Sequence, residues 1–229
     1  MIDTVTLVSI VLSAVGAGGG LLPAVRKIRA LARERRRRRD TRETPQEFYY
    51  RSCLVALRVV VPDREYVQKR EAVLVARRDG LVRVPWGSRP YGEIQVIDEH
   101  VTSPDPALAP AIVDAEATVD QSDGWTRRYM QFGRPLRRNQ EAHFAHVQTT
   151  VVVGKPLEHF LRWSPVARCD HTTLQVAFAG RPPESVRYSA HGPTGEELEG
   201  APVALDVITG AYTVQIDNPI PGRYYKLRW

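Results

Sequence analysis

The sequence predicts a mainly β protein, an antiparallel β-sandwich or barrel preceded by one N-terminal helix. Apolar and polar residues alternate in many short runs after residue 47, which is the pattern of half-buried strands. Gly, Pro, Asn and Asp separate these runs at short intervals, and no long amphipathic helix follows residue 47. The uncharged stretch near the N-terminus is the one segment that predicts a helix.

Residues 1–25 are predicted to contain a transmembrane helix. Residues 5–25 carry no charge, and a helix of this length would extend roughly 31 Å, about the thickness of a bilayer core. A secretory signal peptide would place positive charge before the apolar stretch, whereas here Asp3 precedes it and Arg26 follows it. The alternative is a buried or amphipathic helix in a chain that does not cross the membrane.

Residues 26–47 are predicted to form a basic juxtamembrane helix or linker. Basic flanks stay in the cytoplasm, so we expect a single-pass protein of the cell membrane with its N-terminus outside and its C-terminal domain cytoplasmic. An unbroken run of arginines is expected to contact membrane lipids, each charge contributing about 1 kcal/mol with anionic headgroups. Nucleic acid is a less suitable partner, because no aromatic residues interrupt this run. The run consists of Arg35, Arg36, Arg37, Arg38 and Arg39.

Small residues spaced by four lie within the predicted span, and Gly16 and Gly20 are one such pair. This spacing lets two helices approach closely in lipid. Homo-oligomerisation through the span is therefore an expected partner interaction.

Charge is unevenly divided along the chain. Residues 1–47 hold ten Lys/Arg and five Asp/Glu, whereas residues 48–229 hold twenty-two and twenty-one. The net charge of +6 is therefore a property of the N-terminal segment. The remaining chain is close to neutral, which does not favour a nucleic-acid-binding domain.

Residues 48–122 are predicted to be β-rich. The Arg78-Asp79-Gly80 sequence is typical of a hairpin turn between two of the strands. Residues 103–124, rich in Pro, Asp, Ser and Ala, are expected to form a loop with at most a short strand or helix. The predicted strands are Tyr49–Val61, Glu71–Arg77, Leu81–Val84 and Glu93–Ile97.

Residues 123–229 are predicted to form a β-sandwich of immunoglobulin-like size, because seven short strands with regular turns fill about 100 residues. The last residue, Trp229, is expected to be tied into the core, since a frayed end would expose its ring. The predicted strands are Glu141–Val153, Leu157–Trp163, Thr172–Phe178, Ser185–Ala190, Val203–Val207, Ala211–Ile216 and Tyr224–Trp229.

The sequence offers little for catalysis. It contains no phosphate-binding loop, dinucleotide fingerprint, zinc-protease motif or nucleophile elbow, and no cofactor is expected. Cys169 and His171 would share one face of a strand, and His143 would complete a weak candidate metal site. The alternative is a buried cysteine with surface histidines. No catalytic residue is assigned, and an enzymatic activity is possible in principle but unsupported.

Two short segments combine aromatic residues with arginine, the residue types that anchor protein interfaces. The alternative is that the tryptophan rings close the core. The interface candidates are Trp86, Arg89 and Tyr91 in the first segment and Trp125, Arg127 and Arg128 in the second.

The uncharged residues 5–25, the arginine run and the strand-rich region 48–229 together resemble, in architecture, small bacterial membrane-anchored proteins with a cytoplasmic β-rich domain. These include β-barrel effectors of nucleotide-signalled antiphage systems, which usually have two spans where this chain has one. The resemblance implies that the β domain senses a ligand and the span acts on the bilayer. It transfers no functional residue.

These sequence features leave three alternative functions. The first is a membrane-tethered interaction or scaffold module that binds another protein. The second is a ligand-gated membrane effector of a bacterial defence system, assembling through its span. The third is an enzyme or metal protein.

Overall fold

The computed structural model describes residues 47–86, 94–114, 128–154 and 159–229. Residues 45–229 form one compact unit. The predicted span and the basic segment lie outside the described residues. Within the described part of the chain, no helix is long and apolar enough to cross a bilayer.

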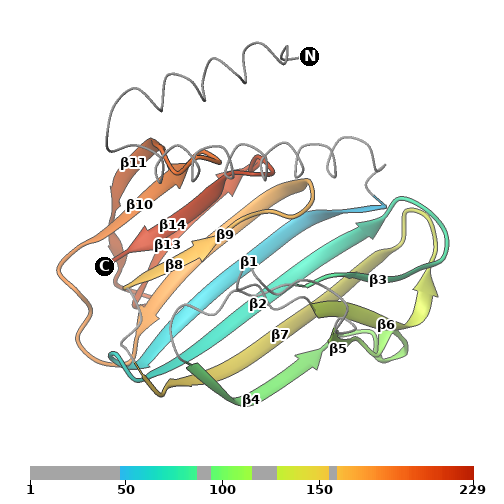
Figure 1. Cartoon of the computed structure of the whole chain (residues 1–229), viewed down its shortest axis with the longest axis horizontal. Coiled ribbons are helices and arrows are strands. Elements are labelled where there is room, and N and C mark those ends of the chain that lie inside the picture. Colours follow the sequence, from blue (N-terminus) through green and yellow to red (C-terminus); the bar gives the residue numbers. More distant parts are fainter. Residues whose placement is uncertain (1–46, 87–93, 115–127, 155–158) are drawn as a thin grey trace, which may run out of the picture. The chain divides into compact units, whose positions relative to one another are not determined.

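A seven-stranded sheet, the large sheet, runs through the unit (Figure 1). Its β1 and β9 strands are parallel to each other, and all its other neighbouring strands are antiparallel. In spatial order the strands are β12 (Leu205–Asp206), β13 (Ala211–Asp217), β9 (Cys169–Phe178), β1 (Phe48–Val61), β2 (Glu65–Ala76), β7 (Glu141–Val152) and β4 (Ile94–Thr102).

Two smaller antiparallel sheets complete the described structure. A 3-10 turn, η1 (Pro106–Leu108), precedes β5. The four-stranded sheet has the order β11 (Glu197–Val203), β10 (Val186–His191), β14 (Tyr224–Arg228) and β8 (Phe160–Trp163). The three-stranded sheet has the order β3 (Leu81–Pro85), β6 (Arg128–Leu136) and β5 (Ala111–Asp114).

One hydrophobic core joins the three sheets. Buried residues alternate along the central strands, so one face of the large sheet is apolar. Leu74 of β2 is fully buried in this core, and burying a leucine side chain contributes about 1.5–3 kcal/mol. The smaller sheets supply facing side chains such as Met130 of β6 and Leu227 of β14. Strands from both halves of the sequence therefore stabilise each other.

The prediction of a mainly β protein built from antiparallel sheets is confirmed. The predicted hairpin around Gly80 is wrong in its pairing, although Gly80 adopts the positive φ of +79° expected in a turn. The strand before this turn, β2, pairs with β1 and β7, whereas the strand after it, β3, pairs with β6. The turn thus leads the chain from one sheet to another.

Two strands were not predicted. β6 contains Gly133 and Pro135, which weaken a strand pattern. β11 is almost entirely exposed, contains Gly200 and Pro202, and has no alternating apolar face. Both strands form because a neighbouring strand offers backbone hydrogen-bond partners.

The C-terminal residue packs against the core, as predicted. The Trp229 ring lies edge-on to Phe178, with 5.6 Å between ring centroids, and stacks on His159. Its backbone N–H donates to the His159 carbonyl, with an N to O distance of 3.1 Å. These contacts hold the chain end against β9 of the large sheet.

Candidate functional site

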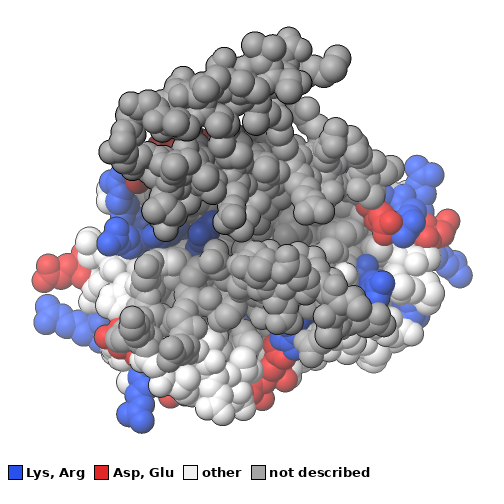
Figure 2. Space-filling view, viewed as in Figure 1, with Lys and Arg blue, Asp and Glu red and all other residues white. Residues whose placement is uncertain are grey.

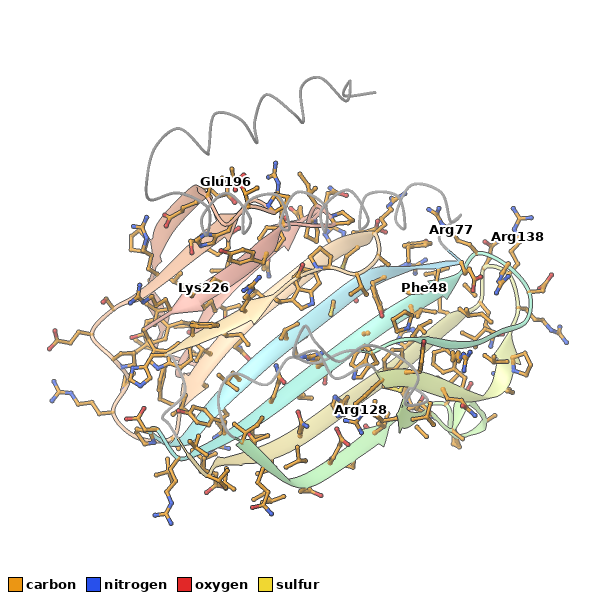
Figure 3. The ribbon with its side chains drawn as sticks, in the orientation of Figure 1. Phe48, Arg77, Arg128, Arg138, Glu196 and Lys226 are labelled. Atoms are coloured by element: carbon orange, nitrogen blue, oxygen red, sulfur yellow. The ribbon has the colours of Figure 1, made fainter. Side chains whose placement is uncertain are left out.

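Two of the predicted interface residues, Trp86 and Arg128, belong to one polar network. The indole Nε1 of Trp86, next to β3, donates to Nδ1 of His146 on β7 over 3.1 Å. His146 Nε2 lies 2.9 Å from Oε1 of Glu99 on β4. Arg128, the first residue of β6, donates to both oxygens of Glu99 over 2.5 and 2.6 Å. The network thus links the three-stranded sheet to the large sheet; Figure 3 labels its member Arg128.

Backbone and ring contacts hold this network in place. The Trp86 N–H donates to the Arg128 carbonyl over 2.7 Å, extending the pairing of β3 with β6. The Trp86 ring lies edge-on to Phe144, with centroids 5.3 Å apart. The Arg70 guanidinium lies over the indole, 5.9 Å from its centroid. Trp86 is only 7% exposed, and its ring packs in the core, as the alternative to an interface role predicts.

The hydrogen bonds assign the tautomer of His146. An indole N–H is a donor only, so Nδ1 of His146 accepts and the ring proton sits on Nε2, which donates to Glu99. The pKa of His146 lies below its ordinary value, mainly because the ring is buried; the Arg70 and Arg128 charges also lower it, and the Glu99 carboxylate opposes them. The Arg128 hydrogen bond holds the pKa of Glu99 below its ordinary range. At neutral pH the network therefore contains a neutral imidazole beside an Arg–Glu ion pair.

Because of this network, the free energy of unfolding is expected to decrease as the pH is lowered. His146 binds its proton less well when folded, so protonation of the unfolded chain lowers the free energy of unfolding as the pH falls below the ordinary value of 6.5. Because the pKa of Glu99 is lowered in the folded protein, the free energy of unfolding falls further as the pH drops below the ordinary Glu pKa of 4.5. Urea unfolding between pH 4 and 8 measures this dependence. The H146Q variant should show a weaker pH dependence between pH 5 and 6.5, and an unchanged slope would contradict the assignment.

The network has a structural role. His146 has both ring nitrogens in hydrogen bonds, and the Glu99 carboxylate is held bidentate by Arg128. None of the four side chains is a free base next to a nucleophile, which acid–base or covalent catalysis requires. The network instead fixes how the three-stranded sheet sits on β7 and β4.

The candidate metal ligands are separated. Cys169 is buried on β9, and its thiol lies 3.1 Å from the His171 carbonyl oxygen. The His171 ring points to solvent and pairs with Asp217. His143 lies on β7, which two strands, β1 and β2, separate from β9, a distance of about 14 Å. Within the described residues, no three His, Cys, Asp or Glu side chains cluster as metal ligands would.

Both cysteines are poor nucleophiles. Cys53 and Cys169 are free thiols buried on the neighbouring strands β1 and β9. Burial raises the pKa of the Cys53 thiol to about 12 and also raises the pKa of Cys169. A thiol acts as a nucleophile only as the thiolate, so both are inert at neutral pH.

The other candidate residues lie outside the described part of the chain. These are the interface candidates Arg89, Tyr91, Trp125 and Arg127, the membrane-surface residues Arg35, Arg36, Arg37, Arg38 and Arg39, and the helix-packing residues Gly16 and Gly20.

An exposed aliphatic pair stands at the turn between β12 and β13. Val207 is 86% exposed and Ile208 is 92% exposed. The Asp206 carboxylate accepts from the Ile208 N–H over 2.9 Å and from the Thr209 hydroxyl over 2.8 Å. Gly210 closes the turn with a positive φ of +65°. The turn is therefore stabilised locally while its two aliphatic side chains face solvent.

Further exposed aliphatic residues lie at the same end of the large sheet. Strand registers place the β12–β13 turn, the end of β1, the start of β2, the end of β7 and the start of β4 together. Figure 2 shows uncharged side chains along the lower edge of the view, near the start of β4. We call this region the apolar end; its exposed members are Val61, Val96, Ile97, Val153, Val207 and Ile208.

The opposite end of the large sheet is charged. Arg78 pairs with Glu47 there, and Arg51 pairs with Glu141. Figure 2 shows side chains of both charges grouped on the right, where Figure 3 labels Arg77 and Arg138. The end of the large sheet where β1 begins is thus rich in ion pairs, whereas the end where β1 stops carries exposed aliphatic residues beside the charged Asp63 and Arg64 of the β1–β2 turn.

The exposed aliphatic residues of the apolar end were not predicted from the sequence. In the sequence, Val207 reads as the last residue of the predicted strand Val203–Val207. The signal that could have found the exposed pair is the composition of the turn itself. Turns are normally built from Gly, Asn, Asp, Ser and Pro, so two aliphatics between Asp206 and Thr209 are unusual.

Comparisons with known proteins add little. No protein-family model matches the sequence, and no curated protein matches it. An M1 zinc metallopeptidase from Deinococcus radiodurans aligns with 80% of this chain and 42% of its own, at 11% identity and a TM-score of 0.44. A putative protease from Parabacteroides distasonis aligns with 81% of this chain and 41% of its own, at 10% identity and a TM-score of 0.40. The chain spans about two fifths of these structures, and similarity this low does not inform its function.

Proposed function

We propose that this protein is a membrane-tethered interaction or scaffold module whose β domain binds another protein through the apolar end. The observation that carries the proposal is the pair Val207 and Ile208, 86% and 92% exposed on a turn that Asp206 stabilises. The tether and the N-terminal helix of the fold prediction belong to the proposal, as does the cytoplasmic location of the β domain. They rest on the uncharged residues 5–25 and the basic residues that follow.

Exposed aliphatic residues mark an interface when they are grouped. Single surface leucines and valines are common, whereas contiguous apolar patches of several hundred Å² are sites of association. The apolar end extends along seven strands, a width of about 29 Å at normal strand spacing. This width is consistent with the roughly 800 Å² that each partner buries in an ordinary complex.

The turn is well suited to insert into a partner. A turn that is already ordered loses little conformational entropy on binding, so the buried aliphatic area contributes more fully to affinity. Because Trp86 is buried, the proposed anchors are the exposed Val207 and Ile208. Transfer of two such side chains from water into a partner would contribute about 3–6 kcal/mol before the costs of association.

Site-specific photo-crosslinking in cells tests the proposal. A photoreactive residue at position 208 of the full chain should give a discrete protein adduct, and one at Val166, which is also exposed but away from the turn, should not. The V207S substitution should reduce the adduct. A lipid adduct, or no adduct, would overturn the docking proposal. Alkaline carbonate extraction of the same cells tests the tether, because the full chain should stay in the membrane pellet and a chain starting at Arg26 should not.

A further inference from the structure

The large sheet has a second face, opposite the face that holds the core. Residues of β1, β2 and β7 alternate between buried and partly exposed, so the partly exposed ones share this second face. It is open to solvent, since the side chains of Lys69, Glu71 and His143 are 46%, 44% and 52% exposed. We call it the outer face; the aliphatic residues at its centre are Leu54, Ala56, Val67, Val73, Ala145 and Val147.

Two neighbouring rows across the centre of the outer face have the same pattern. In each row, the strand registers place one charged residue of β2 between an aliphatic residue of β1 and an aliphatic residue of β7. One row consists of Ala56, Lys69 and Val147, and the next consists of Leu54, Glu71 and Ala145. Along β2, Val67 follows the first row and Val73 follows the second. The two rows therefore differ mainly in the sign of the central charge.

This arrangement is complementary to itself. If a two-fold axis lies between the two rows and perpendicular to the strands, each row faces the other row of a second copy. Lys69 of one copy then meets Glu71 of the other, and Val67 meets Val73. Lys69 and Glu71 already pair within the chain, so the charges of the two copies would alternate in one network. An axis parallel to β2 would instead place Lys69 against Lys69, and like charges across an interface are strongly unfavourable.

We propose that a second copy of this chain binds the outer face, so that two large sheets pack face to face in a two-fold dimer. Packed sheets lie about 10 Å apart, and small residues such as Ala56 and Ala145 permit this approach. The neighbouring strands β9, β1, β2, β7 and β4 each have nine residues or more. Together they form a surface of about 24 by 30 Å, close to the roughly 800 Å² that each partner buries in a stable complex.

The outer face is distinct from the other association sites of the chain. The apolar end is the edge where the strands stop, whereas the outer face is the flat surface of the sheet between its ends. Association through the predicted span would not depend on the charges of β2. The dimer and the proposed function can therefore fail independently.

Charge reversal in the full chain tests the proposal. Light scattering in neutral detergent measures the molecular mass over a range of protein concentrations, and from it the dissociation constant of the dimer. K69E sets carboxylates against each other at two symmetric positions, and should raise this constant about tenfold or more. K69E/E71K exchanges the two charges and should restore the wild-type constant. The matched control R187E reverses an exposed charge of another ion pair, on β10, and should change the constant less than twofold.

A photoreactive residue at position 147 gives a second readout in cells. It should produce an adduct of twice the chain mass, whereas a lipid adduct or an adduct with a different protein would overturn the proposal.

The variants separate the remaining explanations. Self-association that K69E leaves unchanged would overturn the proposal in favour of the span. A K69E/E71K chain that stays as weakly associated as K69E would show that the two charges do not meet across a two-fold axis. V207S should leave the dimer intact, because it alters only the apolar end. Circular dichroism of each variant confirms that the sheet is folded.

Discussion

The W86A variant is expected to lower the free energy of unfolding by about 4 kcal/mol, as large-to-small aromatic substitutions in cores do. Trp86 packs edge-on against Phe144 and is 7% exposed, so its removal leaves a cavity between the three-stranded and large sheets. It also leaves Nδ1 of His146 without its donor. An unpaired buried polar atom adds a cost of about 1–3 kcal/mol, part of which the range for such substitutions already includes.

Urea unfolding of the full chain, followed by far-ultraviolet circular dichroism, measures this effect. The W86F variant keeps most of the ring packing and should lose less stability than W86A. This experiment also decides between the two roles considered for Trp86. A W86A protein as stable as the wild type would show that the ring is a surface anchor and that the core is closed by other residues.

The E99A variant is expected to destabilise the protein by about 3 kcal/mol, the lower part of the range for breaking a buried ion pair. Arg128 would keep its charge in a position where its side chain is only 17% exposed, without the carboxylate that it binds through two hydrogen bonds. His146 would lose its Glu99 partner in the same step. The expected loss therefore comes mainly from removing the carboxylate that binds this partly desolvated cation.

A double-mutant cycle tests the origin of this loss. The E99A/R128A protein should be less destabilised than the sum of the two single variants, because Glu99 and Arg128 bind each other directly and each single substitution already breaks that contact. The matched control is E71A, which breaks an exposed ion pair with Lys69 on the surface of β2 and should cost less than about 1 kcal/mol. Strict additivity in the cycle would contradict a direct coupling between Glu99 and Arg128.

The expected effects of both substitutions are on stability, because the polar network holds strands together. Its parts come from β3, β4, β6 and β7, which lie far apart in sequence. The surface proposed to bind a partner lies elsewhere, at the apolar end of the large sheet.

The sequence by itself predicted most of the strands, although not β6 and β11. The apolar alternation in residues 53–59 and 172–178 showed which side chains share a face, because successive side chains of a regular strand point to opposite faces. It also showed that Trp229 belongs in the core.

Only the tertiary structure decided which strands pair and what they bury. Backbone hydrogen bonds are chemically the same for every residue, so the local pattern around Gly80 does not reveal that β2 and β3 enter different sheets. Trp86 and Arg128 carried a sequence signal for an interface, yet they meet His146 and Glu99 in the interior, from distant positions in the chain. Val207 and Ile208 carried a strand signal, yet they are exposed, because burial depends on long-range packing that no local pattern contains.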